Sequence, residues 1–200
     1  MYMFLLSELF WHVQQTKEKG RGVFAKLRIP KGTVIGDYLG KVTHIADYDP
    51  NLEKGLYLLS FTNDLFIYPD LSSPGVYLLN HSCRPNAWMY IYHGHTLFFA
   101  LHDITPGEEI TISYLLSPQD ESCMGACAHI CFCGSEFCRG TMHLSPSSYR
   151  LWQMHLAKEK RKTTMASYTV GAYLSKLSSY PLFIPTDPIY EIIMHDTEVV

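Results

Sequence analysis

The sequence predicts a mostly β domain of short strands, followed by a metal-organised loop and C-terminal helices. Three observations predict this fold class. Short runs of β-branched and aromatic residues alternate with turn residues as far as residue 114, five of the six cysteines lie within residues 123–138, and a helical pattern begins after residue 145. The 200 residues suffice for one domain or for two small ones.

Turn sequences rich in glycine, proline, asparagine and aspartate divide the first part of the chain. They lie at residues 30–32, 63–64, 72–75, 93–95 and 105–107. The runs between them favour strands, because β-branched and aromatic side chains fit a pleated, half-buried surface. Strands are expected at residues 22–28, 33–39, 56–61, 65–68, 87–92, 96–101 and 109–114.

The C-terminal part begins with the clustered cysteines. Their density, and the Cys-x-Cys spacing of Cys131 and Cys133, favour a metal site over a disulfide framework. A disulfide between these two cysteines would also be strained.

Helices are expected after the cysteines. Ser145 and Pro146 are typical of an N-cap and a first helical position. The apolar positions that follow predict packing against the β core, with an oligomer surface as the alternative. They are Tyr149, Trp152 and Leu156. A second helix is expected over about residues 165–177, and an extended tail from residue 181.

Charge and hydropathy exclude some classes of protein. The net charge of −3 argues against a strongly basic surface for naked nucleic acid. Residues 1–8 are too short and too early charged for a membrane span and contain no basic n-region, so we expect a soluble, intracellular protein. A basic run on the predicted helix favours a solvated face, with an acidic or nucleosomal partner as the alternative. This run consists of Lys158, Lys160, Arg161 and Lys162.

Residues 20–25 match the pattern G-x-G-x-x-A. A dinucleotide site would need a helix directly after the glycines, whereas a strand, a turn and another strand follow here. The pattern is therefore not a dinucleotide site. The glycines either bend a β layer, which is favoured when they are taken alone, or let the backbone approach a ligand closely.

Three further stretches occur after GRGVF at residues 20–24. They are NHSCRPN at 80–86, GEEITISY at 107–114 and CFCGSEFCRG at 131–140. Together and in this order they resemble the SET-domain protein lysine methyltransferases, and the last stretch resembles the post-SET zinc motif of that family. The resemblance covers about residues 11–140.

The resemblance implies a fold of small curved β-sheets with a threaded, pseudoknot-like C-terminal crossing at the NHSCRPN segment. We expect a SET domain at residues 10–116, a post-SET zinc loop at 117–142 and a helical extension at 143–200.

The resemblance also implies transfer of a methyl group from S-adenosylmethionine to a protein lysine. A histone tail is the expected substrate, and a non-histone protein is the alternative. A catalytically silent SET module that binds a peptide or chromatin partner is a second class. A pure zinc-ribbon interaction protein would leave the β region unexplained. The expected compartment is the nucleus or chromosome, with the cytoplasm or delivery into another cell as alternatives.

Tyr114 is the predicted catalytic residue, since its phenol oxygen and nearby backbone carbonyls can polarise the methyl group and orient the amine. A core aromatic at a strand end is the alternative. The acceptor lysine must be neutral although its free pKa is about 10.4. A neighbouring sulfonium in a poorly hydrated channel lowers that pKa, and in-line alignment supplies proximity.

The resemblance assigns cofactor binding to the glycine loop, the crossing and the cysteine loop. Amide and imidazole groups at Asn80 and His81 can hydrogen-bond the donor. The alternative role of Asn80 is to satisfy buried backbone groups, and this is the role expected of Asn86. The predicted cofactor residues are Gly20, Arg21, Gly22, Val23, Phe24, Asn80, His81, Tyr114 and Phe132. Cys83 and His81 are not expected to form a nucleophilic pair, because adjacent positions on a strand face opposite ways.

Aromatic walls are expected around the lysine, with Tyr57, Tyr77 and Ile112 as channel residues beside Tyr114. Many family members carry Phe or Tyr where this chain has Ile112. The number of methyl groups transferred is therefore open, and simple strand packing is the alternative role of Ile112.

Cys131, Cys133 and Cys138 supply three thiolates for a structural zinc ion, which takes four tetrahedral ligands. The family resemblance completes the set with Cys83. Cys123 and Cys127, with His129 nearby, are either spare thiols, which is the favoured interpretation, or alternative ligands or part of a second, incomplete site.

Overall fold

The computed structural model describes residues 3–47, 57–60, 64–119, 127–162, 168–185 and 189–194. Its strands are β1 (Trp11–Gln15), β2 (Arg21–Ala25), β3 (Val34–Asp37), β4 (Gly40–His44), β5 (Leu59–Ser60), β6 (Leu65–Pro69), β7 (Asn80–His81), β8 (Ala87–Tyr92), β9 (His95–Ala100) and β10 (Thr111–Ile112). Its helices are the short 3-10 helices η1 (Ile45–Asp47) and η3 (Val76–Leu78) and the α-helices α1 (Pro146–Lys162) and α2 (Ile189–Met194). None of the helices in these residues has the length and apolar character needed to cross a bilayer.

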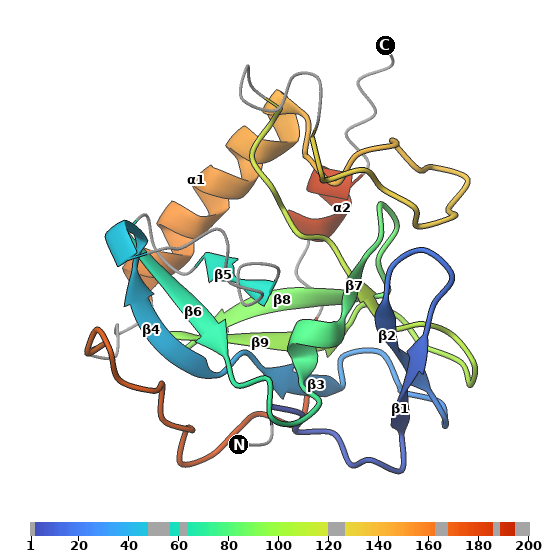
Figure 1. The fold of residues 1–200 in the computed structure, drawn as a ribbon, viewed down its shortest axis with the longest axis horizontal. Helices are drawn as coiled ribbons and strands as arrows, with labels where there is room; N and C mark the ends of the chain where they lie inside the picture. The colour runs from blue at the N-terminus through green and yellow to red at the C-terminus, as the bar shows by residue number, and fades with distance from the viewer. Residues whose placement is uncertain are drawn as a thin grey trace.

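The strands form small, separate sheets (Figure 1). In the described residues these are the hairpin β1–β2, the three-stranded sheets β3–β9–β8 and β4–β6–β5, and the parallel pair β10–β7. The predicted mostly β fold is therefore confirmed. The sequence did not predict β1 or β4 as separate strands, and the strand expected at 109–114 is reduced to the two residues of β10.

The β8–β9 hairpin shows how local sequence fixes a sheet. His93 and Gly94 both have positive φ angles, 46° and 78°, and they join strands that pair Tyr92 with His95. Two left-handed residues give a tight turn whose twist matches that of the strands. Every residue of β9 is buried, so this strand lies at the centre of the fold.

Asn86 connects the two segments that cross near β7 and β10. Its side-chain amide donates to the Glu109 carbonyl at 2.8 Å, and its side-chain oxygen accepts from the Thr111 N–H at 2.8 Å. The Ser82 N–H donates to the Ile112 carbonyl at 2.8 Å. The expected crossing is present, and Asn86 satisfies buried backbone there as predicted.

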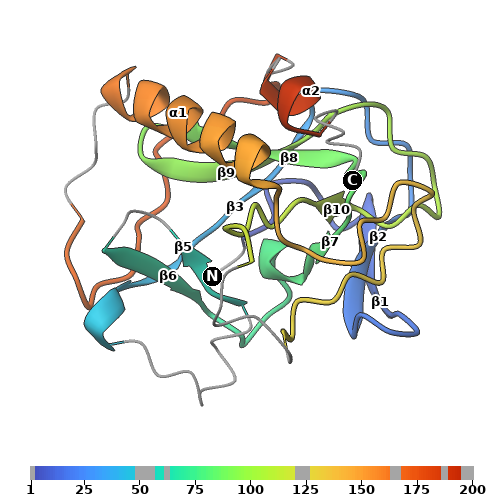
Figure 2. The same ribbon diagram turned by 90° about the horizontal axis from the view of Figure 1, so that it is seen from above.

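Helix α1 lies along the β8–β9 side of the molecule (Figure 2). Trp152 of α1 is buried and meets Trp88 of β8 edge to face, with ring centroids 6.1 Å apart. Tyr149 and Leu156 pack against the same cluster. The prediction that this helix packs on the β core is confirmed.

Two expectations about the C-terminal segment were wrong where the structure describes it. Residues 168–177 are not helical but run beside β4, where the Gly171 N–H donates to the Val42 carbonyl at 2.8 Å and the Leu174 N–H donates to the Gly40 carbonyl at 2.8 Å. Gly171 has φ 87°, which a right-handed helix does not accommodate. Residues 163–167 lie outside the described residues.

The tail from residue 181 is extended only at first. Phe183 forms a β-bridge with Thr33, but residues 189–194 then form α2. Burial explains this helix, because Ile193 is fully buried and the ring of Tyr190 packs 5.2 Å from that of Trp88.

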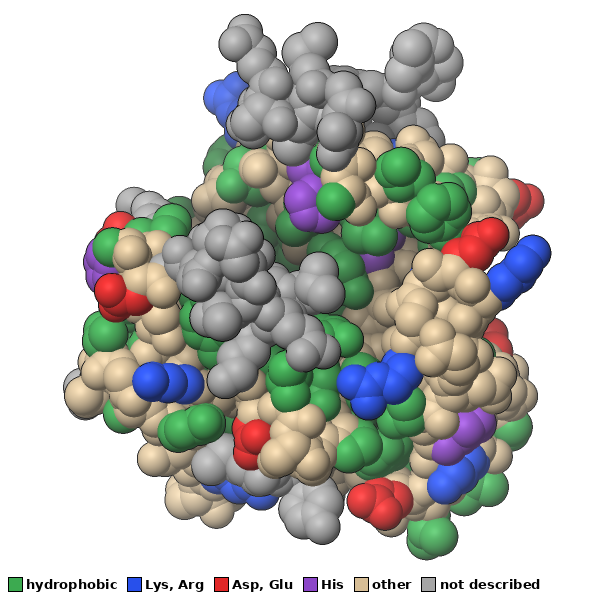
Figure 3. All heavy atoms as spheres, viewed as in Figure 1, with side chains coloured by type: hydrophobic (Ala, Val, Ile, Leu, Met, Phe, Trp, Pro, Cys, Tyr) green, Lys and Arg blue, Asp and Glu red, His purple; other side chains and the backbone are tan. Residues whose placement is uncertain are grey.

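Charges are interspersed on the face shown in Figure 3. Basic and acidic side chains alternate there without a single-sign patch among the residues drawn in colour. Of the predicted basic run, Lys158 is exposed, and the side chains of Lys160, Arg161 and Lys162 lie outside the described residues. The visible face therefore offers no concentrated positive surface to a phosphate backbone.

Candidate functional site

The glycine loop closes the β1–β2 hairpin, and its two glycines have different roles. Gly20 has φ 71° and bends the chain, so that the Thr16 N–H donates to the Gly20 carbonyl at 2.7 Å. Gly22 is a close-approach position, since a Cβ there would lie 2.5 Å from Glu109 Oε1 and 2.9 Å from Asn80 Nδ2. The bend is therefore found at Gly20, whereas Gly22 lets two side chains of the protein approach the backbone, and its approach to a ligand stays a prediction.

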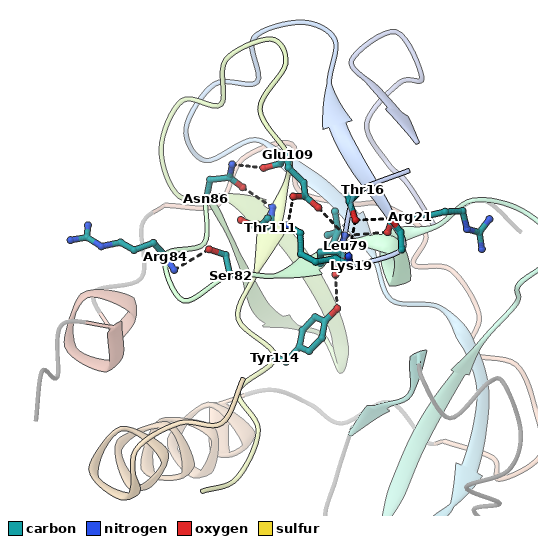
Figure 4. A network of polar contacts seen from close by, with 12 residues as sticks. Thr16, Lys19, Arg21, Leu79, Ser82, Arg84, Asn86, Glu109, Thr111 and Tyr114 are labelled. Carbon is teal, nitrogen blue, oxygen red and sulfur yellow. Dashed lines mark hydrogen bonds and ion pairs between the residues drawn. The ribbon is translucent and has the colours of Figure 1, made fainter. Parts of the chain in front are cut away.

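A polar network joins this loop to the crossing (Figure 4). The Asn80 amide donates to the Arg21 carbonyl at 3.1 Å and to Glu109 Oε1 at 2.8 Å. The Lys19 ammonium pairs with the other oxygen of Glu109. Lys19 and Glu109 were not predicted as site residues, although the sequence GEE at residues 107–109 is a signal for Glu109.

His81 lies beside Asn80 and is almost fully buried. Its Nδ1 accepts a hydrogen bond from the Tyr114 N–H at 3.2 Å, which leaves the ring proton on Nε2. Burial, followed by the positive charges of Arg139 and Lys19, lowers the pKa of His81 to about 4. The imidazole is therefore neutral near pH 7.

Tyr114 is held at both ends. Its N–H binds His81, and its phenol Oη donates to the Leu79 carbonyl at 3.3 Å (Figure 4). The rings of Tyr114 and His81 meet edge to face, with centroids 5.3 Å apart. Burial raises the pKa of Tyr114 to about 12, so its phenol stays protonated near pH 7.

A cluster of tyrosines lies near Tyr114. The rings of Tyr57 and Tyr77 meet edge to face at 5.1 Å, and the buried Tyr38 donates from its phenol to the Tyr57 carbonyl. Burial, and then the neighbouring phenols of Tyr114, Tyr77 and Tyr57, raise the pKa of Tyr38. The structure thus brings the predicted channel tyrosines together and adds Tyr38, whose only signal in the sequence was its place near the end of a predicted strand.

The remaining predicted site residues have varied surroundings. Ile112 is buried and pairs with His81 across the parallel strands β10 and β7. Val23 is fully buried in the core, so only its backbone can face a ligand, and the ring of Phe24 lies 5.9 Å from that of His12. Phe132 is half exposed on the cysteine loop.

The predicted zinc ligands converge. The sulfur atoms of Cys83, Cys131, Cys133 and Cys138 all lie within 4.8 Å of one another. The Cys83 and Cys131 sulfurs are 3.7 Å apart. Tetrahedral zinc with Zn–S bonds of about 2.3 Å places its sulfurs about 3.8 Å apart. The four thiols therefore fit a structural zinc ion that ties the loop to the crossing.

The expected separation of Cys83 from His81 was wrong. The two residues are two positions apart, not adjacent, and the bend after β7 brings Cys83 Sγ to 3.6 Å from His81 Nε2. Burial raises the pKa of Cys83, which opposes formation of a free nucleophilic thiolate. The contact instead places the ring N–H of His81 against a sulfur of the four-cysteine cluster.

Comparisons with known proteins agree with this geometry. The SET-domain family model matches residues 20–115. Histone-lysine N-methyltransferase NSD3 of Mus musculus is 31% identical over 149 residues, covering 68% of this chain and 10% of that protein. A Candida albicans histone-lysine N-methyltransferase, H3 lysine-36 specific, is 34% identical over 139 residues, covering 63% of this chain and 16% of that protein.

A solved structure also matches. KRYPTONITE in complex with mCHH DNA, an H3(1-15) peptide and SAH has a TM-score of 0.53 and 25% identity, over 66% of this chain and 29% of that one. The chain belongs to the SET-domain family. It spans only 10 to 16% of the length of the two curated relatives described above.

Proposed function

We propose that this chain is an S-adenosylmethionine-dependent protein-lysine N-methyltransferase and that its substrate is a histone tail. The observation that carries the proposal is the position of Tyr114. It is fixed between the Asn80–His81 segment and a cluster of tyrosines, as a residue between a methyl donor and a lysine would have to be.

The residues predicted to bind the donor fit its chemistry. The donor supplies a methyl group on a sulfonium cation. Gly22 lets the backbone lie close against Glu109 and Asn80, where a Cβ would clash. The two amide hydrogens of Asn80 already bind the Arg21 carbonyl and Glu109, so its side-chain oxygen is the atom that can accept a hydrogen bond from the donor. The imidazole of His81 is neutral, so it places no second positive charge near the sulfonium.

The tyrosine cluster fits the acceptor side. Tyr38, Tyr57 and Tyr77 are buried or half-buried and would exclude water from a lysine side chain, which favours its neutral form. The neutral amine nitrogen would form a bond to the methyl carbon as the carbon–sulfur bond breaks. The sulfur would leave as a neutral thioether, and the methylated amine would release its proton to water. Because the Tyr114 phenol stays protonated, it orients the reacting groups and does not act as the base.

A histone substrate is proposed because the relatives are named histone-lysine methyltransferases and the KRYPTONITE structure contains an H3 peptide. A nuclear or chromatin location follows from the same names. A non-histone substrate is the second candidate, because this chain covers a small part of each relative.

The test is methyl transfer from labelled S-adenosylmethionine to separate core histones and to nucleosomes, read by mass spectrometry. The variant is Tyr114→Phe, and the matched control is Tyr173→Phe, since Tyr173 is 55% exposed. Label that depends on Tyr114 alone supports the proposal. Cofactor binding without histone label would indicate a non-histone substrate. The absence of both cofactor binding and histone label would indicate a silent module and would overturn the proposal.

A further inference from the structure

A second group of metal-ligating side chains lies outside the four-cysteine cluster. Cys127, His129 and His143 place one ligand atom each within 4.8 Å of the others. Cys127 Sγ is 3.4 Å from His129 Nδ1 and 3.2 Å from His143 Nε2. Tetrahedral zinc with bonds of about 2.3 Å to sulfur and about 2.0 Å to nitrogen would set such atoms about 3.5 Å apart.

His143 is oriented as a metal ligand by its other ring nitrogen. Its Nδ1 contacts the Ser117 carbonyl, which can only accept a hydrogen bond, so Nδ1 carries the proton. Nε2 is then left with a lone pair, and this is the atom that faces Cys127 Sγ. Metal-bound histidines typically donate their second N–H to a carbonyl or carboxylate in this way. His143 is also buried, so its orientation is restricted.

The backbone holds these residues together at the base of the cysteine loop. The Met142 N–H donates to the His129 carbonyl at 2.9 Å. His143 forms a parallel β-bridge with Leu116, and the Leu144 N–H donates to the Leu116 carbonyl at 3.1 Å. The two ends of the loop therefore meet beside the segment that follows Tyr114.

We propose that Cys127, His129 and His143 form a second zinc site, separate from the four-cysteine site. One thiolate and two imidazoles suit zinc, and water can supply the fourth ligand. Cys123 lies outside the described residues and is not assigned to the site. The site clamps the base of the loop to the segment after Tyr114. Cys127 is then a ligand, whereas the sequence alone favoured a spare thiol at this position.

The rival explanation is a set of hydrogen bonds among a thiol and two imidazoles, with no metal. Metal analysis of the full chain, purified under reducing conditions, distinguishes the two. We expect about two zinc ions per chain in the wild type and about one in Cys127→Ser and in His143→Ala. Cys133→Ser should lose the other ion. His102→Ala is the matched control, because His102 is exposed on a different loop, and it should keep both.

Zinc X-ray absorption of the wild type adds a test that needs no variant, in case a substitution prevents folding. Two sites as proposed give a first shell that mixes sulfur with nitrogen, whereas the four-cysteine site alone gives sulfur only. One zinc per chain, an all-sulfur shell, or loss of zinc in His102→Ala would overturn the proposal. Since none of these readouts measures methyl transfer, their failure leaves the proposed function standing.

Discussion

The crossing around β7 and β10 and the cysteine loop at residues 127–143 touch each other, but different forces hold them. In the crossing, Asn86 and Ser82 satisfy buried backbone groups through hydrogen bonds within the protein. In the loop, regular structure is limited to isolated bridges such as Ile130 with Thr141, and side chains converge as ligand sets. The first region can form without metal, whereas we expect the second to depend on it.

This difference divides the residues of the candidate site between the crossing and the cysteine loop. Asn80, His81 and Tyr114 belong to the crossing, whereas the glycine loop and Phe132 lie outside it, and Cys83 joins the crossing to the cysteine loop. Substitutions in the crossing should change chemistry or global stability. Substitutions in the loop should change metal content and local order first.

The largest expected effect is on turnover. Tyr114→Phe removes the phenol oxygen, and loss of one positioned polar group from a transition state typically costs about 100-fold or more in kcat. Stability should fall by only about 1 kcal/mol, because a single hydrogen bond to the Leu79 carbonyl is lost. Single-turnover methyl transfer and urea unfolding measure the two effects. Near-normal turnover would remove Tyr114 from the mechanism.

Cys133→Ser tests the loop. The zinc bound by the four cysteines should be lost, since three thiols hold it much less well, and methyl transfer should fall by roughly 10-fold or more as the loop loosens. Limited proteolysis should cut within residues 127–143 while the crossing stays protected. Unchanged zinc content in this variant would contradict the four-cysteine assignment.

Much of the fold could be predicted because local sequence decides it. The turns at residues 93–95 and 105–107 and the helix that begins at Pro146 have strong local signals, and the structure contains them. The family motifs also identified the four cysteines, whose sulfurs meet in space although Cys83 lies 48 residues before Cys131.

The rest depends on contacts that no local pattern reports. Residues 168–177 were expected to be helical, but their backbone groups pair with those of β4 instead. Lys19 and Tyr38 contribute to the site through partners 90 and 19 residues away, Glu109 and Tyr57. His143 joins Cys127 only because the loop closes on itself.

Asn86→Ala tests the crossing directly. It leaves the buried Thr111 N–H and Glu109 carbonyl without their partners, which should lower the free energy of unfolding by about 2 to 4 kcal/mol. Zinc content should stay unchanged, in contrast to Cys133→Ser. Urea unfolding measures the loss, and Gln15→Ala, an exposed amide at the end of β1, is the control. A loss below that of the control would mean that the crossing is held by other groups.

The smallest expected effect concerns the tyrosine cluster. Tyr38→Phe removes the hydrogen bond to the Tyr57 carbonyl and should cost about 1 kcal/mol of stability. Because Tyr57 then loses one fixed contact, KM for a lysine peptide should rise by about fivefold, the equivalent of about 1 kcal/mol of binding, while kcat changes little. Steady-state kinetics measure kcat and KM separately, with Tyr173→Phe as the control variant. An equal loss in kcat would instead place Tyr38 among the groups that act on the transition state, together with Tyr114 of the crossing.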